Sequence, residues 1–321
     1  MSEPEIIMRI EHLTKKFPLS GGRFLTACDN INFNVRKGET IAVVGESGCG
    51  KTTLLKAIMN MQPPTSGKII FHGVDITKLK GEEKRQNYRH IQMVFQDPTA
   101  AFNPKMRIKD IVCEPLLNFD LISTADVESK ARELLRQVDL PEDFVNRYPH
   151  NMSGGQRQRV AIARALALEP EIIACDEATS ALDVSVQDTI IKLLVKLQRE
   201  KGITYIFICH DMALVSLFAH RVCVMYLGNI MEKFDGDKIN GVCHPYTRAL
   251  LKAVFSTDPE KNQYIGILPG DIPSPLNIPA GCPFQNRCEY CRELCKEKKP
   301  DFREVAPNHF VACHYPLNSI E

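Results

Sequence analysis

The pattern of apolar and polar positions predicts a β-rich N-terminal region that leads into a glycine-rich turn. Alternating apolar residues predict strands over residues 6–17 and 25–35, and a short apolar run predicts a buried strand over 41–44. A turn at 36–39 separates the last two strands, and a helical period begins at 51–61, directly after the glycines. The first predicted helix therefore starts at the glycine-rich turn.

Helices and further strands follow. A strand pair is predicted over 66–76 and a strand over 91–95, before a helical pattern over 98–168 that is strongest at 125–138 and 154–168. Strands and helices then alternate, with strands predicted over 172–175, 204–209 and 221–226 and helices over 184–200 and 212–219. Such alternation indicates crossover connections, and so a largely parallel sheet covered on both faces.

The character of the chain changes after residue 228. Residues 258–308 hold many of the prolines and few apolar runs, which is typical of a loop-rich appendage. We therefore predict a large domain over residues 1–235 and an appendage over residues 236–321.

Composition narrows the class of protein. Of 321 residues, 44% are hydrophobic and 25% are charged, which is ordinary for a soluble globular chain and argues against disorder. The formal net charge of +1 gives no electrostatic signature of nucleic-acid or anionic-lipid binding. The longest apolar runs, such as 206–209, fall far short of the roughly 18–20 residues of a membrane span. The start of the chain also lacks the pattern of a secretory signal, so we expect a cytosolic protein.

The cysteines form two groups. A cytosolic protein is kept reduced, so twelve cysteines do not predict disulfides. Those between Cys28 and Cys223 are scattered, several within apolar runs, where a thiol acts as a small hydrophobic group. Five others crowd between Cys282 and Cys313, in a segment with little apolar sequence of its own.

Residues 45–52, GESGCGKT, match the phosphate-binding pattern G-x-x-x-x-G-K-[ST] between a predicted strand and a predicted helix. Glycines allow backbone N–H groups to surround phosphate oxygens, and the helix start adds partial positive charge. The Lys51 ammonium can reach the β- and γ-phosphates, and the Thr52 hydroxyl can bind Mg²⁺. The pattern therefore predicts a nucleoside triphosphate site.

A second candidate element ends the apolar run at 172–175. Asp176 and Glu177 follow this run, at the carboxyl edge of the predicted sheet, where open α/β sheets bind ligands. Asp176 suits the Mg²⁺ shell, and Glu177 can position or deprotonate an attacking water. The alternative is that the two acids only cap the start of the next helix.

The remaining motifs resemble those of ATP-binding-cassette ATPases. Met152–Gln158 (MSGGQRQ) resembles the signature motif, residues 180–183 (SALD) the D-loop, Gln96 in VFQDP the Q-loop, and His210 in ICHD the switch histidine. Their order matches the family over about residues 5–235. The resemblance implies an α/β fold with a P-loop NTPase core, a β-rich N-terminal subdomain, a helical subdomain and the loop-rich, cysteine-containing C-terminal appendage.

The resemblance also assigns roles. Ser153 is a good N-cap, and the helix start that it opens is expected to face the γ-phosphate of ATP held by a second subunit, with Asp183 in the D-loop. Glu177, His210 and Gln96 are expected to be catalytic, and Mg²⁺ ligands are expected from Thr52, Gln96 and Asp176. The signature contacts to that ATP are expected from Ser153, Gly154, Gly155 and Gln156. The expected ATP-binding residues are Phe17 (with Phe24 as competitor for the adenine), Gly45, Ser47, Gly48, Cys49, Gly50, Lys51, Thr52 and Thr53.

Two classes of cassette protein remain, namely transporter subunits and soluble ATPases that act on DNA or ribosomes. Soluble members that act on DNA carry long coiled coils between the phosphate-binding loop and the signature motif, whereas this chain has no sustained heptads between Lys51 and Ser153. Ribosome-associated members carry two cassettes, and this chain has one. These features favour transport, with hydrolysis of ATP to ADP and phosphate as the driving reaction.

Longer strings resemble the ATPase subunits of bacterial dipeptide and oligopeptide importers. The strings are MVFQDPTAAFNPKM, SALDVSVQ, HPYTRALL and GDIPSPLNIPAGCPFQNRC, which resemble the FQDP/SALDVS member of an unequal ATPase pair. The implied partners are a sister ATPase, two permease subunits and an extracytoplasmic substrate-binding protein, with this subunit at the cytoplasmic face of the membrane. Nickel, glutathione and some sugar importers share these strings, so the cargo stays open.

Two hypotheses concern cysteines. Cys49 lies near a helix start, an environment that lowers the pKa of a thiol, so we expect alkylation of Cys49 to inhibit ATP binding; the alternative is a thiol that points into the fold. A [4Fe–4S] cluster is expected in the appendage, where the four spaced cysteines resemble the cluster-binding tail of peptide-importer ATPases, with zinc or unligated thiols as alternatives. The expected ligands are Cys282, Cys288, Cys295 and Cys313, with Cys291 as an extra thiol.

Overall fold

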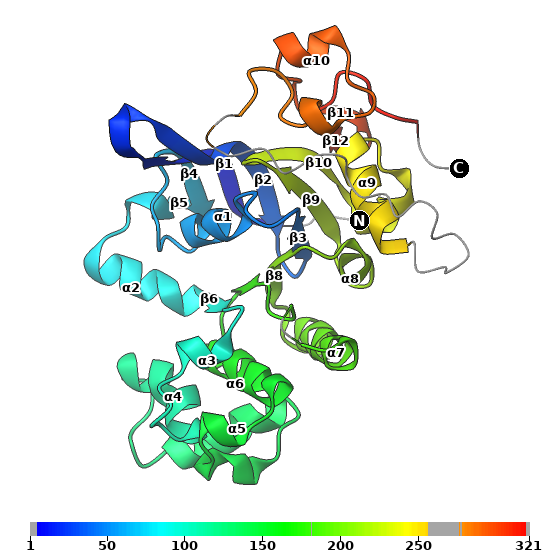
Figure 1. Cartoon of the computed structure of the whole chain (residues 1–321). Coiled ribbons are helices and arrows are strands. Elements are labelled where there is room, and N and C mark those ends of the chain that lie inside the picture. The colour runs from blue at the N-terminus through cyan, green and yellow to red at the C-terminus, as the bar shows by residue number, and fades with distance from the viewer. Residues whose placement is uncertain (1–4, 181, 256–275, 277, 319–321) are drawn as a thin grey trace. The chain divides into compact units, whose positions relative to one another are not determined.

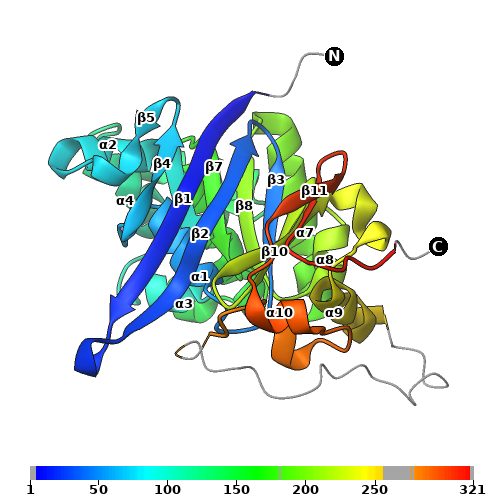
Figure 2. The same ribbon diagram turned by 90° about the horizontal axis from the view of Figure 1, so that it is seen from above.

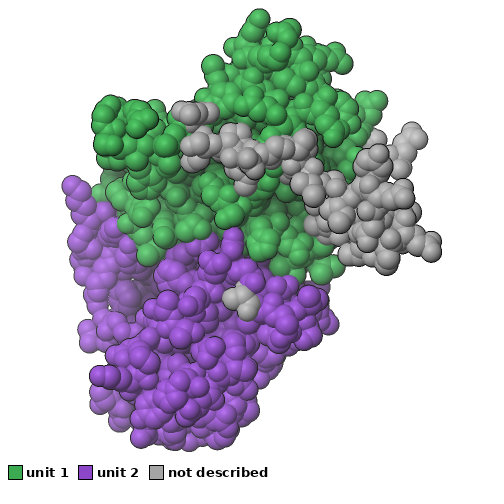
Figure 3. All heavy atoms as spheres, in the orientation of Figure 1, with its two compact units in different colours: residues 1–78, 208–321 green, residues 79–207 purple. Residues whose placement is uncertain are grey.

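The computed structural model describes residues 5–180, 182–255, 276 and 278–318. These residues form two compact units, one built from residues 1–78 and 208–321 and the other from residues 79–207 (Figure 3). The α/β fold predicted from the sequence is confirmed in both units. The predicted boundary at residue 235 stays a prediction.

The first unit contains a four-stranded antiparallel sheet in the order β2-β1-β4-β5. Figure 2 shows the long β1–β2 pair with β4 beside β1. Met8 of β1 lies opposite Val35 on one neighbour and Phe71 on the other, and the Met8 side chain is fully buried. The strands are β1 (Ile6–Pro18), β2 (Phe24–Arg36), β4 (Ser66–Phe71) and β5 (Val74–Asp75), as the alternating pattern predicted.

A second run of strands in the same unit has the order β11-β12-β10-β9-β3. β3 pairs with β9 in parallel and is buried along its whole length, which suits a strand with apolar residues at consecutive positions. The other pairings are antiparallel. The strands are β3 (Thr40–Val44), β9 (Arg221–Tyr226), β10 (Asn229–Asp235), β11 (Arg303–Ala306) and β12 (His309–Val311).

The apolar pattern of the sequence did not predict β11 and β12. These two short strands extend the sheet beside β10, so backbone pairing joins this part of the C-terminal appendage to β10 (Figure 1). The helices of this unit are α1 (Lys51–Ile58), α8 (Met212–Ser216), α9 (Pro245–Phe255) and α10 (Glu293–Glu297), with short 3₁₀ turns at 20–22, 76–78, 236–241 and 285–287. Two of them are shorter than predicted: α1 ends at Ile58 because Asn60 adopts a left-handed backbone (φ 52°), and α8 ends at Ser216.

In the second unit, β6 pairs with β7 in parallel, with Ile91 opposite Ile172, which agrees with the predicted largely parallel sheet. β8 lies next to β7 in the sheet, on the side opposite to β6. The strands are β6 (Ile91–Val94), β7 (Ile172–Asp176) and β8 (Thr204–Cys209), and the helices are α2 (Gly81–His90), α3 (Pro98–Ala101), α4 (Ile108–Asn118), α5 (Val127–Gln137), α6 (Gly154–Leu166) and α7 (Val184–Lys201), with 3₁₀ turns at 142–146 and 149–151. In the described part of the chain, no helix has both the length and the apolar content that a membrane crossing requires.

Candidate nucleotide site and cysteine pocket

The phosphate-binding loop joins β3 to α1, which confirms the predicted strand–loop–helix placement. Two glycines are required by close backbone approaches. A Cβ atom on Gly45 would lie 2.1 Å from the Met225 carbonyl oxygen, and one on Gly50 would lie 2.0 Å from the Ala27 carbonyl oxygen. Gly50 also has φ of 109°, which side chains other than glycine's rarely tolerate. The loop can therefore take this path only with glycine at both positions.

Lys51 begins α1 and folds back over the loop. Its Nζ donates hydrogen bonds to the carbonyl oxygens of Gly45 at 2.7 Å and Glu46 at 2.9 Å. Lys51 itself is buried, whereas Ser47 and Thr52 on the outer side of the loop are exposed. The loop thus holds the Lys51 ammonium in place and leaves the side chains of Ser47 and Thr52 accessible to a ligand. Gly48 is also exposed, and Thr53 is half-buried.

Cys49 does not have the reactive environment that the sequence suggested. Its thiol is 4% exposed, and burial raises the pKa of the Cys49 thiol above its ordinary value, although the nearby Lys51 acts in the opposite direction. The prediction of a lowered pKa is therefore wrong. Desolvation of the thiolate outweighs the helix start and the lysine, and the alternative of a thiol pointing into the fold is the one observed.

The second unit brings Gln96, Glu177 and Ser180 together. Gln96 Nε2 donates hydrogen bonds to Glu177 Oε2 at 3.0 Å and to Ser180 Oγ at 3.3 Å. Asp176 is the buried last residue of β7, and Glu177 has a left-handed backbone with φ of 46°. A left-handed conformation at a residue other than glycine is a strained feature that clusters at functional sites. The chain is thus bent sharply where the two carboxylates stand, and Glu177 is oriented by an amide that lies 81 positions earlier in the sequence.

The residues of the signature motif form the predicted cap of α6. Ser153 Oγ accepts a hydrogen bond from Gln156 N at 3.3 Å, and Gln156 Oε1 accepts one from Ser153 N at 3.0 Å, a complete capping box. A Cβ atom on Gly155 would lie 2.5 Å from Val186 Cγ1, so α6 and α7 approach closely here. Gly154 has more room, because a Cβ atom there would meet only a Leu182 methyl at 3.4 Å.

The D-loop aspartate caps α7. Asp183 Oδ1 accepts hydrogen bonds from Val186 N at 3.0 Å and Ser185 Oγ at 2.7 Å, and the bond from Ser185 is the main cause of the lowered pKa of the Asp183 carboxyl. Ala181 of this motif and residues 270–275 of the GDIPSP string lie outside the described residues.

The aromatic and histidine candidates lie in the first unit. Phe17 is half-buried near the end of β1, with Lys15 Nζ 5.2 Å from its ring centroid, and Phe24 is 58% exposed at the start of β2. Neither ring belongs to the buried core, so each can stack on a ligand. His210 is exposed directly after β8, and the following Asp211 caps α8 by accepting a hydrogen bond from Ala213 N at 2.7 Å.

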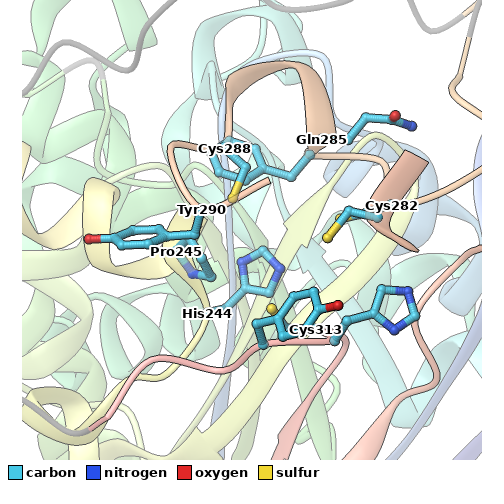
Figure 4. A pocket seen from close by; sticks show the side chains of 11 residues that line it. His244, Pro245, Cys282, Gln285, Cys288, Tyr290 and Cys313 are labelled. Atoms are coloured by element: carbon cyan, nitrogen blue, oxygen red, sulfur yellow. The ribbon is translucent and has the colours of Figure 1, made fainter. Parts of the chain in front are cut away.

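Four cysteines of the C-terminal region line one small pocket, which Figure 4 shows from close by. The lining includes Cys282, Cys288, Cys295 and Cys313, whereas Cys291 is not among its residues. Burial is the largest cause that raises the pKa of Cys282 to about 12 and that of Cys313 to about 11. Cys291 is absent from the lining although its thiol interacts with that of Cys295, so the pocket favours the four predicted ligands over the fifth thiol, a distinction that spacing alone left open.

His244 is a pocket residue that sequence reasoning missed. The sulfur atoms of Cys282, Cys288 and Cys313 are drawn around its imidazole in Figure 4. His244 Nδ1 accepts a hydrogen bond from Tyr246 N at 3.0 Å, and burial lowers the pKa of His244 to about 4, so the ring is neutral and its proton resides on Nε2. This Nε2 is buried and has no partner of normal hydrogen-bond geometry among the described residues, although the nearby Ala312 backbone raises the pKa of the ring against the effect of burial.

A different trio of polar side chains has the tighter spacing of a metal site. Within the described ranges, the one group of three potential ligand residues with all ligand atoms within 4.8 Å of one another is Glu232, Cys243 and His309. The carboxylate of Glu232 already accepts hydrogen bonds from Cys243 N at 2.6 Å and His244 N at 3.2 Å, and Oε1 lies 2.7 Å from His309 Nε2. These bonds account for the buried carboxylate, so the trio joins β10, β12 and the segment before α9.

Comparisons with known proteins agree with this geometry. Residues 28–180 match the ABC transporter family, and residues 235–295 match the oligopeptide/dipeptide transporter C-terminal region. The chain is 44% identical over 321 residues to the oligopeptide transport ATP-binding protein AppF of Bacillus subtilis, covering 97% of each chain. It is 43% identical to the oligopeptide transport ATP-binding protein OppF of Haemophilus influenzae, covering 96% of this chain and 97% of that protein.

A solved structure supports the cassette fold. The dimeric ATP-binding cassette MJ0796 bound to ADP and Pi superposes with a TM-score of 0.65 at 33% identity, covering 71% of this chain and 98% of that chain. The part of this chain without a counterpart there is close in size to the predicted C-terminal appendage.

Proposed function

The chain belongs to the ABC transporter ATPases that carry the oligopeptide/dipeptide transporter C-terminal region, and we propose that it hydrolyses ATP to power the import of peptides. The observation that carries the proposal is the similarity to oligopeptide transport ATP-binding proteins over nearly the whole of both chains, appendage included. The intact phosphate loop and the oriented Glu177 support the ATPase part.

The proposed chemistry assigns a role to each group of side chains. The loop from Gly45 to Thr53 binds the phosphates of ATP, and Thr52, Gln96 and Asp176 provide protein ligands for Mg²⁺. Glu177 positions and deprotonates the attacking water, and the hydrogen bond from Gln96 fixes the direction in which its carboxylate points. His210 assists at the γ-phosphate, and Phe17 stacks on the adenine.

The remaining roles concern the proposed assembly. The α6 start, with Ser153, Gly154, Gly155 and Gln156, and the D-loop Asp183 face the ATP of a sister ATPase subunit, and a bound anion there is favoured by the capped helix start. Two permease subunits and an extracytoplasmic binding protein complete the complex, and this subunit binds at the cytoplasmic face of the membrane. The permeases and the binding protein select the cargo.

Transport by the reconstituted complex tests this function. We expect proteoliposomes that contain the complex and the binding protein to hydrolyse ATP faster when oligopeptides are added, and to accumulate labelled peptide. Lys51→Ala should abolish both signals, because it removes the ammonium that binds phosphate. Stimulation by nickel, glutathione or a sugar in place of peptides would contradict the proposed cargo while leaving the ATPase role intact.

We further propose that Cys282, Cys288, Cys295 and Cys313 hold a [4Fe–4S] cluster. Their side chains line one pocket, and the buried Nε2–H of His244 in that pocket is a donor suited to a cluster sulfide. Zinc fits less well, because tetrahedral zinc with Zn–S bonds of about 2.3 Å requires sulfurs about 3.8 Å apart. The four thiols are not a group within 4.8 Å among the described residues, and a cubane with an iron at each of four corners suits their wider spread.

Such a cluster would stabilise a segment that has little apolar core of its own. Anaerobically purified protein should be brown, with about four iron and four acid-labile sulfide per chain. Cys288→Ser should lose the colour and the iron, and the matched variant Cys291→Ser should keep both, since Cys291 lies outside the pocket lining. Colourless protein with stoichiometric zinc and no sulfide would exclude the cluster.

A further inference from the structure

The C-terminal region and the phosphate-binding loop meet at Glu46, the second residue of the loop. The backbone N–H of Glu46 donates a hydrogen bond to Tyr246 Oη at 2.9 Å. The Glu46 carboxylate accepts two parallel hydrogen bonds from Arg287, at 2.7 Å from Nη1 to Oε2 and 3.0 Å from Nη2 to Oε1. With Lys51 bound to the Glu46 carbonyl, the backbone and the side chain of this residue are held from three directions.

These contacts are shielded from water. The Arg287 side chain is 5% exposed and that of Glu46 is 19% exposed, while Tyr246 is fully buried. Burial lowers the pKa of Arg287, but the hydrogen bonds to Glu46 and Tyr226 outweigh it and raise the pKa, so the guanidinium stays charged. A bidentate guanidinium–carboxylate pair fixes both distance and orientation, and breaking one buried partner leaves an uncompensated charge.

The same residues are tied to the cysteine pocket. Arg287 directly precedes Cys288, and Tyr246 follows two positions after the pocket residue His244. Phe284, which also lines the pocket, packs against Tyr246 with ring centroids 5.3 Å apart. Two of the segments that line the pocket, around His244 and around Cys288, are therefore also the segments that hold Glu46.

We infer that Tyr246 and Arg287 are positioning residues for the phosphate-binding loop, and that they couple the state of the cysteine pocket to ATP binding. A change that loosens the pocket releases Glu46 and lets the loop leave its nucleotide-binding path. Because coupling between two sites is reciprocal, bound nucleotide also stabilises the pocket. The positioning role depends only on the ATP site, whereas coupling to iron rests on the cluster proposed above.

The first experiment measures the affinity of the full chain, in complex with its permeases, for a non-hydrolysable Mg-ATP analogue. Tyr246→Phe deletes only the hydroxyl that accepts the hydrogen bond from the Glu46 N–H. Arg287→Met removes the guanidinium that binds the Glu46 carboxylate and replaces it with an uncharged side chain that is also long and unbranched. We expect each to weaken binding by about 5- to 20-fold, the lower range of typical coupling between linked sites. In a double-mutant cycle with Glu46→Gln, the effect of Arg287→Met should largely disappear, which a general loss of folding would not produce.

Matched controls distinguish positioning from general damage. Tyr205→Phe removes a buried hydroxyl that has no hydrogen-bond partner among the described residues, and Lys299→Met breaks an exposed contact of the same C-terminal region to Asp29. Both controls should bind the analogue like the wild type. If the Arg287→Met protein does not fold, the affinity of the Tyr246→Phe protein for the analogue tests the positioning role. Wild-type affinity in a folded Tyr246→Phe protein would overturn the positioning role.

The second experiment measures the pocket. The nucleotide analogue should slow the removal of iron by a chelator by about 5-fold or more in the wild type and have no effect in Arg287→Met. If the protein carries no iron, the cluster proposal fails but the inference is still tested, by the rate at which iodoacetamide alkylates Cys288 with and without the analogue. If bound nucleotide changes neither the rate of iron removal nor the rate of Cys288 alkylation in the wild type, the coupling is refuted.

Discussion

Glu177→Gln should separate ATP binding from ATP hydrolysis. The substitution keeps the size of the side chain, and its amide oxygen can still accept the hydrogen bond that Gln96 Nε2 donates at 3.0 Å to the carboxylate. The phosphate-binding loop is unchanged. What is lost is the proposed base, and a positioned general base contributes about 10²- to 10⁴-fold to a rate, or about 3–5 kcal/mol of barrier. We therefore expect ATP binding near the wild-type level, turnover reduced by that factor and a trapped closed pair of cassettes.

Gln96→Ala provides the comparison. Gln96 is exposed, and the variant removes the hydrogen bond to the Glu177 carboxylate and one proposed Mg²⁺ ligand, while it leaves the proposed base in place. A hydrogen bond of this kind is worth about 1.5–3 kcal/mol at most, and exposure reduces its value, so at saturating Mg²⁺ we expect roughly a 10-fold loss of turnover. The assay is phosphate release at saturating ATP by the purified complex, with nucleotide affinity measured in parallel. Near-normal hydrolysis by Glu177→Gln, or a larger loss in Gln96→Ala than in Glu177→Gln, would refute the assignment of the base.

Three further predictions follow from buried and capping groups. Arg221 and Glu39 form an ion pair in which both side chains are 7% exposed, so Arg221→Met should lower the free energy of unfolding by about 3–5 kcal/mol, and adding Glu39→Met should recover most of the loss in a denaturant titration. Ser153→Ala should cost about 1 kcal/mol and speed amide hydrogen exchange at the start of α6, because it opens the capping box; unchanged exchange would contradict this. Cys49 should resist iodoacetamide in the native protein, whereas Cys291, which lies outside the pocket, should react; rapid labelling of Cys49 would show that its thiol is accessible.

Short sequence patterns predicted the phosphate-binding loop and the α6 cap, because residues close together in the sequence form both. The phosphate-binding loop needs glycine where its backbone approaches Ala27 and Met225, and the α6 cap needs a hydroxyl with a glutamine three positions later. Both requirements leave fixed spacings in the sequence. The strands β1 and β7 were also predictable, because their burial follows the alternating and the continuous apolar patterns.

Helix α2 and strand β11 have no such pattern in the sequence. Helix α2 is almost entirely polar, so an apolar period could not identify it, and its first turn carries the acids Glu82 and Glu83 instead. β11 is exposed at every residue and is formed by pairing with β12, which in turn pairs with β10. The pairing of β12 with β10 places Val311 opposite Glu232, and a short window of sequence does not contain both strands.

Cys49 shows why a local rule can give the wrong sign. The start of α1 and Lys51 both lower the pKa of a nearby thiol, and both can be recognised from the sequence. Burial raises the pKa, is the largest influence on this thiol, and depends on the residues that pack over the loop. The closeness of a thiol to a helix start therefore predicts reactivity only when the thiol is also exposed.

Glu46 shows how two separate sequence matches describe one structural site. The ABC transporter match ends at residue 180, and the match to the oligopeptide/dipeptide transporter C-terminal region begins at residue 235. Arg287 lies in the second region, 241 positions from the Glu46 carboxylate that it binds. A cassette that lacks the second region would need another partner for a carboxylate at this position, because an acid whose side chain is only 19% exposed is costly without one. The second residue of the phosphate-binding loop thus finds the partner of its charge in a segment near the other end of the chain.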